Sequence, residues 1–135
     1  MANTFQLTVV TPERTVLNAE VVSVMAPGAD GYFGVLAHHA AMLAEVGIGR
    51  LTATDAANQM TVMAVSGGFA EVRNNAMTIL ADSAELREHI DIARAEESVK
   101  RARMRLGERS VEIDVSRAEA ALARALNRKD TAAWR

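Results

Sequence analysis

The chain has 135 residues, of which 50% are hydrophobic and 24% are charged, with a formal net charge of −2. This composition is typical of a globular protein and excludes disordered and collagen-like chains, and no apolar run is long enough to span a bilayer. The absence of cysteine excludes disulfides, thiolate metal sites and a cysteine nucleophile.

The N-terminal stretch MANTFQLTVVTPER lacks the basic region, the apolar run and the cleavage site of a secretory signal. We therefore expect a protein that is cytosolic or faces the cytosol.

Composition also divides the chain near residue 84. Residues 1–84 hold seven acidic and three basic residues, whereas residues 85–135 hold ten acidic and twelve basic ones. Seven of the eight glycines and both prolines precede residue 85. We therefore expect two domains, 1–84 and 85–135.

The first domain is predicted to consist of antiparallel β-strands. Short runs rich in Val, Thr, Ile and Leu recur along it, and each is followed by a turn signal. Pro12, the stretch Asp55 to Asn58, and the pair Asn74 and Asn75 provide turn residues. The runs are FQLTVV, TVLNAEVVSVMA, GRLTAT, MTVMAVS, GFAEVR and AMTILAD. Closely spaced strands without a helical period indicate a flattened β-sandwich or barrel.

The second domain is predicted to contain two helices. The first begins after the N-cap Asp91, is supported by contact between Ile90 and Ala95, and ends at Gly107. Its apolar stripe consists of Ile92, Ala95, Val99, Ala102 and Leu106.

The second helix is predicted from a capping box of Ser116 and Glu119 to about Lys129. Its stripe consists of Val115, Ala118, Leu122, Ala125 and Leu126. A short connection between the helices indicates an antiparallel hairpin. Because the seam is narrow and rich in alanine, it contributes little beyond the entropy cost of ordering the helices, so the hairpin can open or detach.

No pattern in the sequence indicates a catalytic or metal site. Gly28, Gly31 and Gly34 lack the spacing of a phosphate-binding loop, which favours a loop that needs positive φ. His38 and His39 are adjacent and would point to opposite faces of a strand, so they cannot share a metal and are better explained as packing or interface residues. Ser66 lacks the GxSxG pattern of a nucleophile.

The arginines of the helices have more than one interpretation. Arg101, Arg103, Arg105 and Arg109 alternate with acids, and few aromatic residues are present for base stacking. A solvated face or an acidic protein partner is therefore favoured over nucleic acid.

Arg94 lies in the first turn of a helix, where the helix dipole disfavours a cation. Arg124 and Arg128 are four residues apart, share one helical face and repel each other. The three arginines could converge on one polyanion. Alternatively, Asp91 pairs with Arg94 and the other two are simply solvated.

Four stretches of the chain resemble the epsilon subunit of bacterial F-type ATP synthases. They are LTVVTPERTVLNAEV, GYFGVLAHHAAML, SGGFAEVRNNAMTILADSAE and the tail IDIARAEES to EIDVSRAEAALARALNR. His39 matches the family histidine. Ala37, His38 and Ala41 stand where the family usually has Pro, Gly and Pro, which should loosen that loop.

The resemblance implies a flattened β-sandwich of about ten strands followed by a two-helix hairpin. It implies a non-catalytic subunit of the central stalk, peripheral at the cytoplasmic face of the bacterial membrane and not inserted into it. The expected partners are the gamma subunit, the c-ring and, through the helices, the beta subunits, without nucleic acid. The implied c-ring contacts are Asp30, Gly31 and Tyr32, and the implied gamma contacts are His39, Met42 and Leu43.

The tail is similar to that of family members that bind ATP as a regulatory ligand. Their motif I/L-D-x-x-R-A is matched by Ile90, Asp91, Arg94 and Ala95, and Glu85, Arg101, Arg124 and Arg128 are further implied site residues. The resemblance implies that ATP favours a folded-down hairpin that permits ATP hydrolysis, whereas the extended hairpin blocks it. No cofactor is required. The alternative is a purely structural coupling subunit whose tail binds no nucleotide.

Overall fold

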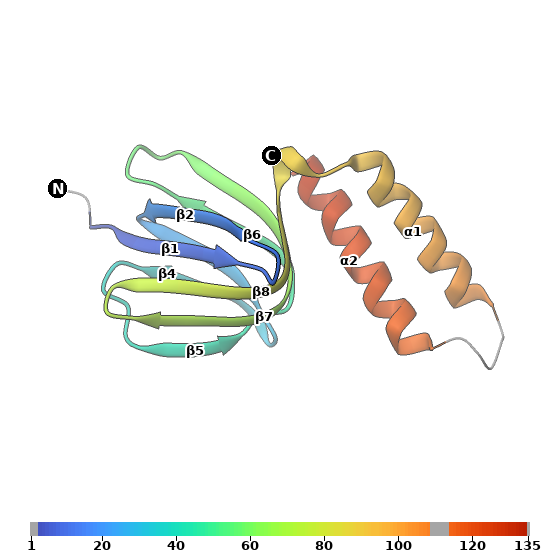
Figure 1. Cartoon of the computed structure of the whole chain (residues 1–135), viewed down its shortest axis with the longest axis horizontal. Helices are drawn as coiled ribbons and strands as arrows, with labels where there is room; N and C mark the ends of the chain where they lie inside the picture. Colours follow the sequence, from blue (N-terminus) through green and yellow to red (C-terminus); the bar gives the residue numbers. More distant parts are fainter. Residues whose placement is uncertain (1–2, 109–113, 135) are drawn as a thin grey trace. The chain divides into compact units, whose positions relative to one another are not determined.

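A computed structural model describes residues 3–108 and 114–134 of the chain. Two compact units are present, Met1–Leu86 and Arg87–Arg135, and they are described separately below (Figure 1). The described part of the first unit contains strands, and that of the second contains helices. The predicted β-sandwich followed by a helical hairpin is therefore confirmed.

Of the eight strands described in the first unit, seven form one continuous hydrogen-bonded path and β5 is attached to its side. The order is β2-β1-β8-β7-β6-β3-β4, and β5 pairs with β7. Every pairing is antiparallel except that of β1 with β8. The strands are β1 (Phe5–Val10), β2 (Thr15–Val21), β3 (Ser23–Gly28), β4 (Gly31–Leu36), β5 (Met42–Glu45), β6 (Ile48–Thr54), β7 (Met60–Arg73) and β8 (Ala76–Leu86).

The strand number differs slightly from the expectation of about ten. The runs MTVMAVS and GFAEVR are not separate strands but together form the 14-residue strand β7. Gly67 (φ 69) and Gly68 (φ 109) adopt backbone conformations that other residues avoid. They allow β7 to change direction while it stays paired with β8, so that its first half pairs with β6 and its second half with β5.

Alternation along the strands places one side chain in two in the core. Leu7 and Val9 of β1, and Met77 and Ile79 of β8, are each 0% exposed, whereas their neighbours in sequence are more exposed. Leu51 of β6 is buried in the same cluster. Burial of each such large side chain contributes about 1.5–3 kcal/mol, so this core is the main source of stability in the unit.

Turns form where the sequence predicts them. Asn74 (φ 51) and Asn75 (φ 57) make the two-residue connection between β7 and β8. Oδ1 of Asp55 accepts the backbone N–H groups of Ala57 and Gln59, each at 2.9 Å. The glycine-rich segment is a tight hairpin between β3 and β4, in which Gly31 has a φ of 131°. The prediction of a loop is wrong for Gly28 and Gly34, which lie in those strands.

His38 and His39 lie in the turn after β4, not in a strand, so their assignment to opposite faces of a strand is wrong. His38 has a φ of 62°, and its N–H donates to Oδ1 of Asn75 at 2.8 Å. Nδ2 of Asn75 in turn donates to the carbonyl of Thr4 at 2.9 Å. The left-handed conformation explains why glycine suits position 38, because a side chain at this φ is strained.

The second unit consists of the 3-10 helix η1 (Arg87–His89), α1 (Ile92–Gly107) and α2 (Val115–Ala133). The bounds of α1 and its N-cap Asp91 are as predicted, but Ile92 is 51% exposed and does not belong to the buried stripe. The start of α2 differs, because Asp114 is the N-cap and accepts the Arg117 N–H at 3.1 Å. A carboxylate is available two residues before Ser116, so the helix begins before the predicted capping box. Val115 is consequently 54% exposed and does not belong to the seam.

The two helices pack through small side chains. Ala95, Val99 and Ala102 of α1, and Ala118 and Ala125 of α2, are buried. These residues bury little apolar area each, so the seam stabilises the hairpin weakly compared with the core of the sandwich. Neither helix described here has the apolar length that a transmembrane span requires.

Substitution His38→Gly should stabilise the full chain by about 0.5–1 kcal/mol, because the relief of left-handed strain exceeds the added entropy of the unfolded glycine. Urea unfolding measures the change. His38→Ala is the control, since it removes the ring but keeps the strain, and it should not stabilise. Equal stabilisation by both variants would show that the imidazole ring, and not the left-handed backbone, destabilises the chain at position 38.

Candidate functional site

The residues predicted for a nucleotide site belong to the second unit, apart from Glu85. Glu85 is half-buried near the end of β8, where it pairs with Ala64 of β7. Ile90 is 8% exposed and Ala95 is 0% exposed, so both are packing residues at the start of α1. Their role in the motif is to fix the first turn of the helix.

Asp91 is used as a helix cap. Its Oδ1 accepts the backbone N–H of Arg94 at 3.1 Å, and its carbonyl accepts the N–H of Ala95 at 3.0 Å. The alternative in which Asp91 and Arg94 form an ion pair is not realised. Within residues 3–108 and 114–134, no carboxylate lies within ion-pair distance of the Arg94 guanidinium, which is exposed. Arg94 therefore lies at the helix end where the dipole disfavours a cation, and the nearby Asp91 carboxylate caps the backbone instead of pairing with the Arg94 guanidinium.

Arg94 and Arg101 share one face of α1 through Ser98. Oγ of Ser98 donates to the Arg94 carbonyl at 3.0 Å, and Nη2 of Arg101 donates to the same Oγ at 3.0 Å. Arg101 also lies 3.9 Å from the carboxylate of Glu97, but both side chains are mostly exposed. Such a solvated pair contributes little, so Arg101 remains available to an anion.

Arg124 is exposed on α2, and Arg128, one turn later, is half-buried. α2 contacts η1, which precedes α1, so the last turns of α2 lie beside the beginning of α1. The structure therefore brings Arg94 and Arg128 to the same end of the hairpin, with Arg101 and Arg124 further along it.

Sequence reasoning missed Arg87. Its Nη1 donates to the backbone carbonyl of Trp134 at 2.9 Å, which links the first residue of the unit to the end of α2. No sequence pattern could have indicated this contact, because Arg87 precedes the periodic part of α1 and its acceptor is a main-chain atom.

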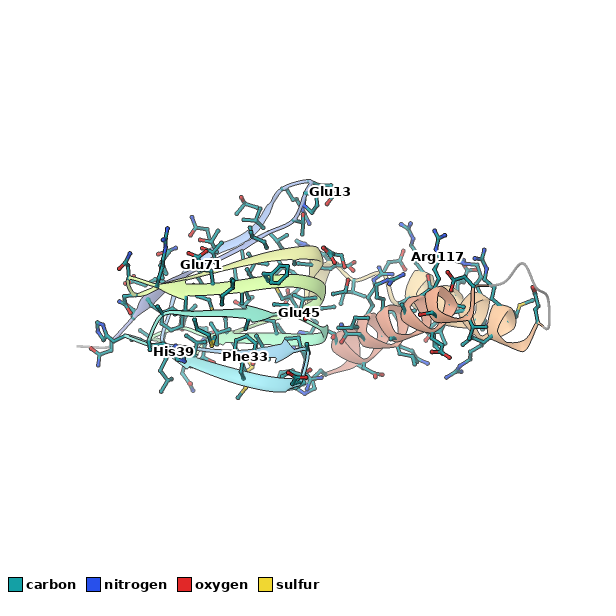
Figure 2. The ribbon with its side chains drawn as sticks, turned by 90° about the horizontal axis from the view of Figure 1, so that it is seen from below. Glu13, Phe33, His39, Glu45, Glu71 and Arg117 are labelled. Atoms are coloured by element: carbon teal, nitrogen blue, oxygen red, sulfur yellow. The ribbon has the colours of Figure 1, made fainter. Side chains whose placement is uncertain are left out.

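The residues predicted to contact other subunits fall in two places on the sandwich. Asp30, Gly31 and Tyr32 are exposed at the β3–β4 turn, and the Tyr32 hydroxyl accepts the Arg50 N–H at 3.0 Å. His39 and Met42 are half-buried and Leu43 is 71% exposed, with His39 before β5 and the other two within it. In Figure 2, His39 and Glu45 mark the two ends of this segment.

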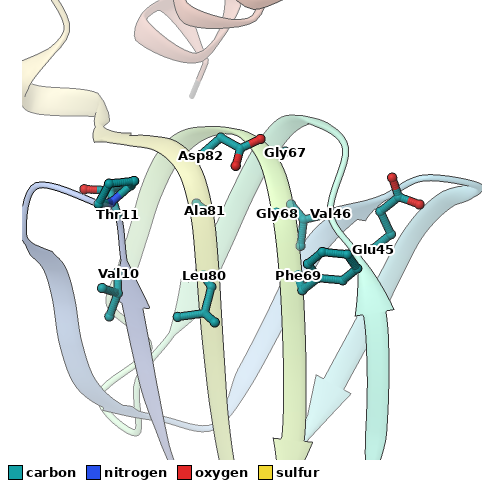
Figure 3. Close-up of a pocket in the computed structure, with 11 residues that line it drawn as sticks. Val10, Thr11, Glu45, Val46, Gly67, Gly68, Phe69, Leu80, Ala81 and Asp82 are labelled. Atoms are coloured by element: carbon teal, nitrogen blue, oxygen red, sulfur yellow. The ribbon is translucent and has the colours of Figure 1, made fainter.

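An apolar surface that was not predicted from the sequence includes Leu43. Val10, Leu80 and Phe69 are cross-strand neighbours on β1, β8 and β7 (Figure 3). Leu80 is 58% exposed and Phe69 is 55% exposed, and both line an open pocket of about 580 Å³ whose rim carries Glu45 and Asp82. We call Leu43 of β5, Phe69 of β7 and Leu80 of β8 the β5–β7–β8 apolar surface. Strand alternation could have indicated this surface, because Phe69 is two residues before Glu71 and four before Arg73 and so lies on the same exposed face of β7.

The comparisons with known proteins agree across the whole chain. The family model for the ATP synthase delta/epsilon chain β-sandwich domain matches residues 4–87, and the model for its long α-helix domain matches residues 88–133. An ATP synthase epsilon chain of Desulforapulum autotrophicum is 48% identical over 128 residues, covering 95% of each chain. One of Symbiobacterium thermophilum is 50% identical over 123 residues, covering 90% of this chain and 88% of the relative.

Solved structures show the same fold. A chain of the Euglena gracilis mitochondrial ATP synthase matches with a TM-score of 0.79 at 23% identity, covering 90% of this chain and 76% of that chain. A chain of the Tetrahymena thermophila mitochondrial ATP synthase central stalk/c-ring structure matches with a TM-score of 0.60 at 16% identity, covering 94% and 95%. Because both domain models match and relatives at nearly half identity cover almost the whole length, the chain belongs to the ATP synthase delta/epsilon chain family.

Proposed function

We propose that the chain is a non-catalytic subunit of the central stalk of a bacterial F-type ATP synthase, at the cytoplasmic face of the membrane. The sandwich would join the rotor, and the helical hairpin would regulate ATP hydrolysis by sensing ATP. The similarity to proteins named ATP synthase epsilon chain supports the first part. The exposed Arg94, without an ion-pair partner in the described residues, is the observation that carries the second.

The proposed rotor partners are the gamma subunit and the c-ring. The two structural neighbours come from assemblies whose descriptions include the c-ring. For gamma, we propose the β5–β7–β8 apolar surface, because contiguous exposed apolar side chains typically mark protein interfaces. It includes Leu43, one of the residues that the family resemblance implies for that contact. For the c-ring, we propose the exposed β3–β4 turn at Asp30, Gly31 and Tyr32.

Polar substitution of the apolar surface should weaken binding to gamma. Phe69→Thr and Leu80→Thr retain strand propensity but remove apolar contact area, and each should weaken binding by about tenfold or more if it is a binding hot spot. Met60→Thr is the matched control, because Met60 is also on β7, is 48% exposed and lies outside this surface. Titration of gamma with the full chain measures affinity. An equal effect of all three variants would refute this location.

ATP sensing is proposed from the charge distribution on the hairpin. Guanidinium groups bind phosphate oxygens through paired hydrogen bonds, which suits Arg94, Arg101, Arg124 and Arg128. An anion at Arg94 would also compensate the cation at the helix N-terminus. Because the arginines come from both helices and the seam between them is weak, ATP would stabilise the closed hairpin by binding it preferentially. Participation of Glu85, and contact of the extended hairpin with the beta subunits, are further parts of this proposal.

Millimolar ATP should raise the melting temperature of the full chain, since a ligand at 100 times its Kd stabilises the folded state by about 2.7 kcal/mol. Arg94→Ala and Arg124→Ala should each reduce this shift. Arg103→Ala is the control, because position 103 is nine residues from Arg94 and so lies on the opposite side of α1. If wild type shows no shift, the chain is the purely structural coupling subunit of the alternative interpretation.

Removal of the helical unit tests regulation separately. A chain ending at Leu86 keeps β8 complete. Assembled into the ATP synthase, it should give faster ATP hydrolysis than the full chain at low ATP, because the extended hairpin can no longer block the motor. The hydrolysis rate of the purified complex is the measurement, with incorporation of the shortened chain as its control. Identical rates at all ATP concentrations would contradict an inhibitory hairpin.

A further inference from the structure

The two ends of the helical hairpin are held in different ways. At one end, residues 108–114 connect α1 to α2 through the covalent chain. At the other end, Nη1 of Arg87 donates to the carbonyl of Trp134 at 2.9 Å, and η1 contacts α2. The second end is therefore closed by non-covalent contacts, and the Arg87–Trp134 hydrogen bond is one of them that involves a charged group.

The acceptor of this bond is well suited to a cation. Trp134 is the C-cap of α2, and its N–H donates to the Thr131 carbonyl at 3.2 Å. Carbonyl groups at a helix C-terminus lack intrahelical partners and carry partial negative charge, so a guanidinium there is favourable both as donor and as cation.

Arg87 also lies near a carboxylate. The Glu88 carboxylate lies 3.8 Å from Nη2, and its side chain is 63% exposed, whereas that of Arg87 is 29% exposed. An ion pair of this length and exposure contributes little. The shorter bond to Trp134 is thus the contact that fixes the Arg87 side chain.

Separation of the helices at this end is opposed only by non-covalent contacts, whereas at the other end the covalent connection limits how far the helices can move apart. Between the ends, Ala95, Val99, Ala102, Ala118 and Ala125 form a seam that buries little area per residue. At the non-covalent end, Ile90 and Thr131 are also buried, at 8% and 0% exposed. Helix ends nevertheless open locally at a lower free-energy cost than the core of a unit, so the Arg87 contact adds to these two residues in resisting opening.

We propose that the Arg87–Trp134 contact holds the hairpin closed and sets the fraction of molecules in which α2 separates from its non-covalent end, without any ligand. The contact also affects ATP binding, and this part of the inference rests on the proposed nucleotide site. Because Arg94 and Arg128 lie at this same end, the contact keeps them together and lowers the ordering cost of binding a polyanion. Arg87 would then favour ATP binding without touching ATP.

The test uses the full chain without nucleotide, so that its result is independent of whether ATP binds. Arg87→Met keeps the length and the apolar stem of the side chain but removes its donors. Arg103→Met is the control, because Arg103 is exposed on α1 and its substitution changes the net charge by the same amount. Native-state hydrogen exchange of backbone amides 128–134, at the end of α2, is compared with that of β1 and β8.

We expect Arg87→Met to accelerate exchange at amides 128–134 by about tenfold, in line with the loss of a charged hydrogen bond that is partly exposed. Exchange in β1 and β8 should stay unchanged, and Arg103→Met should behave as wild type. Unchanged exchange at the end of α2 in Arg87→Met would overturn the proposal. Equal acceleration in both variants would overturn it as well, because net charge and not the contact would then be responsible.

Discussion

Gly67 and Gly68 form the corner on which the arrangement of the sandwich depends. A Cβ atom at Gly67 would meet Asp82 Oδ2 at 2.1 Å, and one at Gly68 would meet the Leu80 carbonyl at 1.9 Å. Opposite them, the Val46 N–H donates to the Gly68 carbonyl at 2.9 Å, and the Gly67 N–H donates to the Gly47 carbonyl at 3.2 Å. β7 and β8 therefore change direction together with the β5–β6 connection, and Phe69 emerges beside Leu80 on the outer face.

The two units differ in how tightly they are built, and this difference matches the proposed division of roles. The sandwich buries large side chains such as Leu7, Leu51 and Met63, each 0% exposed. The hairpin buries mostly small side chains, and a charged hydrogen bond joins Arg87 to the end of α2. A unit that carries torque in a rotor must keep its shape, whereas a unit that responds to a ligand needs two states separated by a few kcal/mol.

Local chemistry made much of the fold predictable. Asp91 caps α1, and Asn74 with Asn75 turns β7 into β8, because each of these conformations is favoured by a few adjacent residues. β4 was missed because its glycines indicated a loop, and β5 because it is four residues long. The single predicted run TVLNAEVVSVMA is divided between the two strands β2 and β3. The start of α2 was misplaced because Ser116 and Asp114 both offer an N-cap. Of the arginines of the proposed site, Arg94 could be named from the motif and Arg101, Arg124 and Arg128 from the wider family resemblance. The Arg87–Trp134 contact could not, because a side-chain bond to a distant carbonyl depends on tertiary packing.

The parallel pairing of β1 with β8 bears on the order in which the chain folds. β1 lies between β2 and β8, with Leu7 opposite Met77. One edge of β1 can therefore pair only after β8, the last strand, has been synthesised. Contacts between residues so far apart in sequence form slowly, because the loop must close before the contact is gained. The hairpin, whose helices are neighbours in sequence, follows β8 immediately during synthesis. The sandwich is therefore complete only shortly before the hairpin is synthesised, so the proposed rotor-binding surface does not form long before the unit proposed to regulate it.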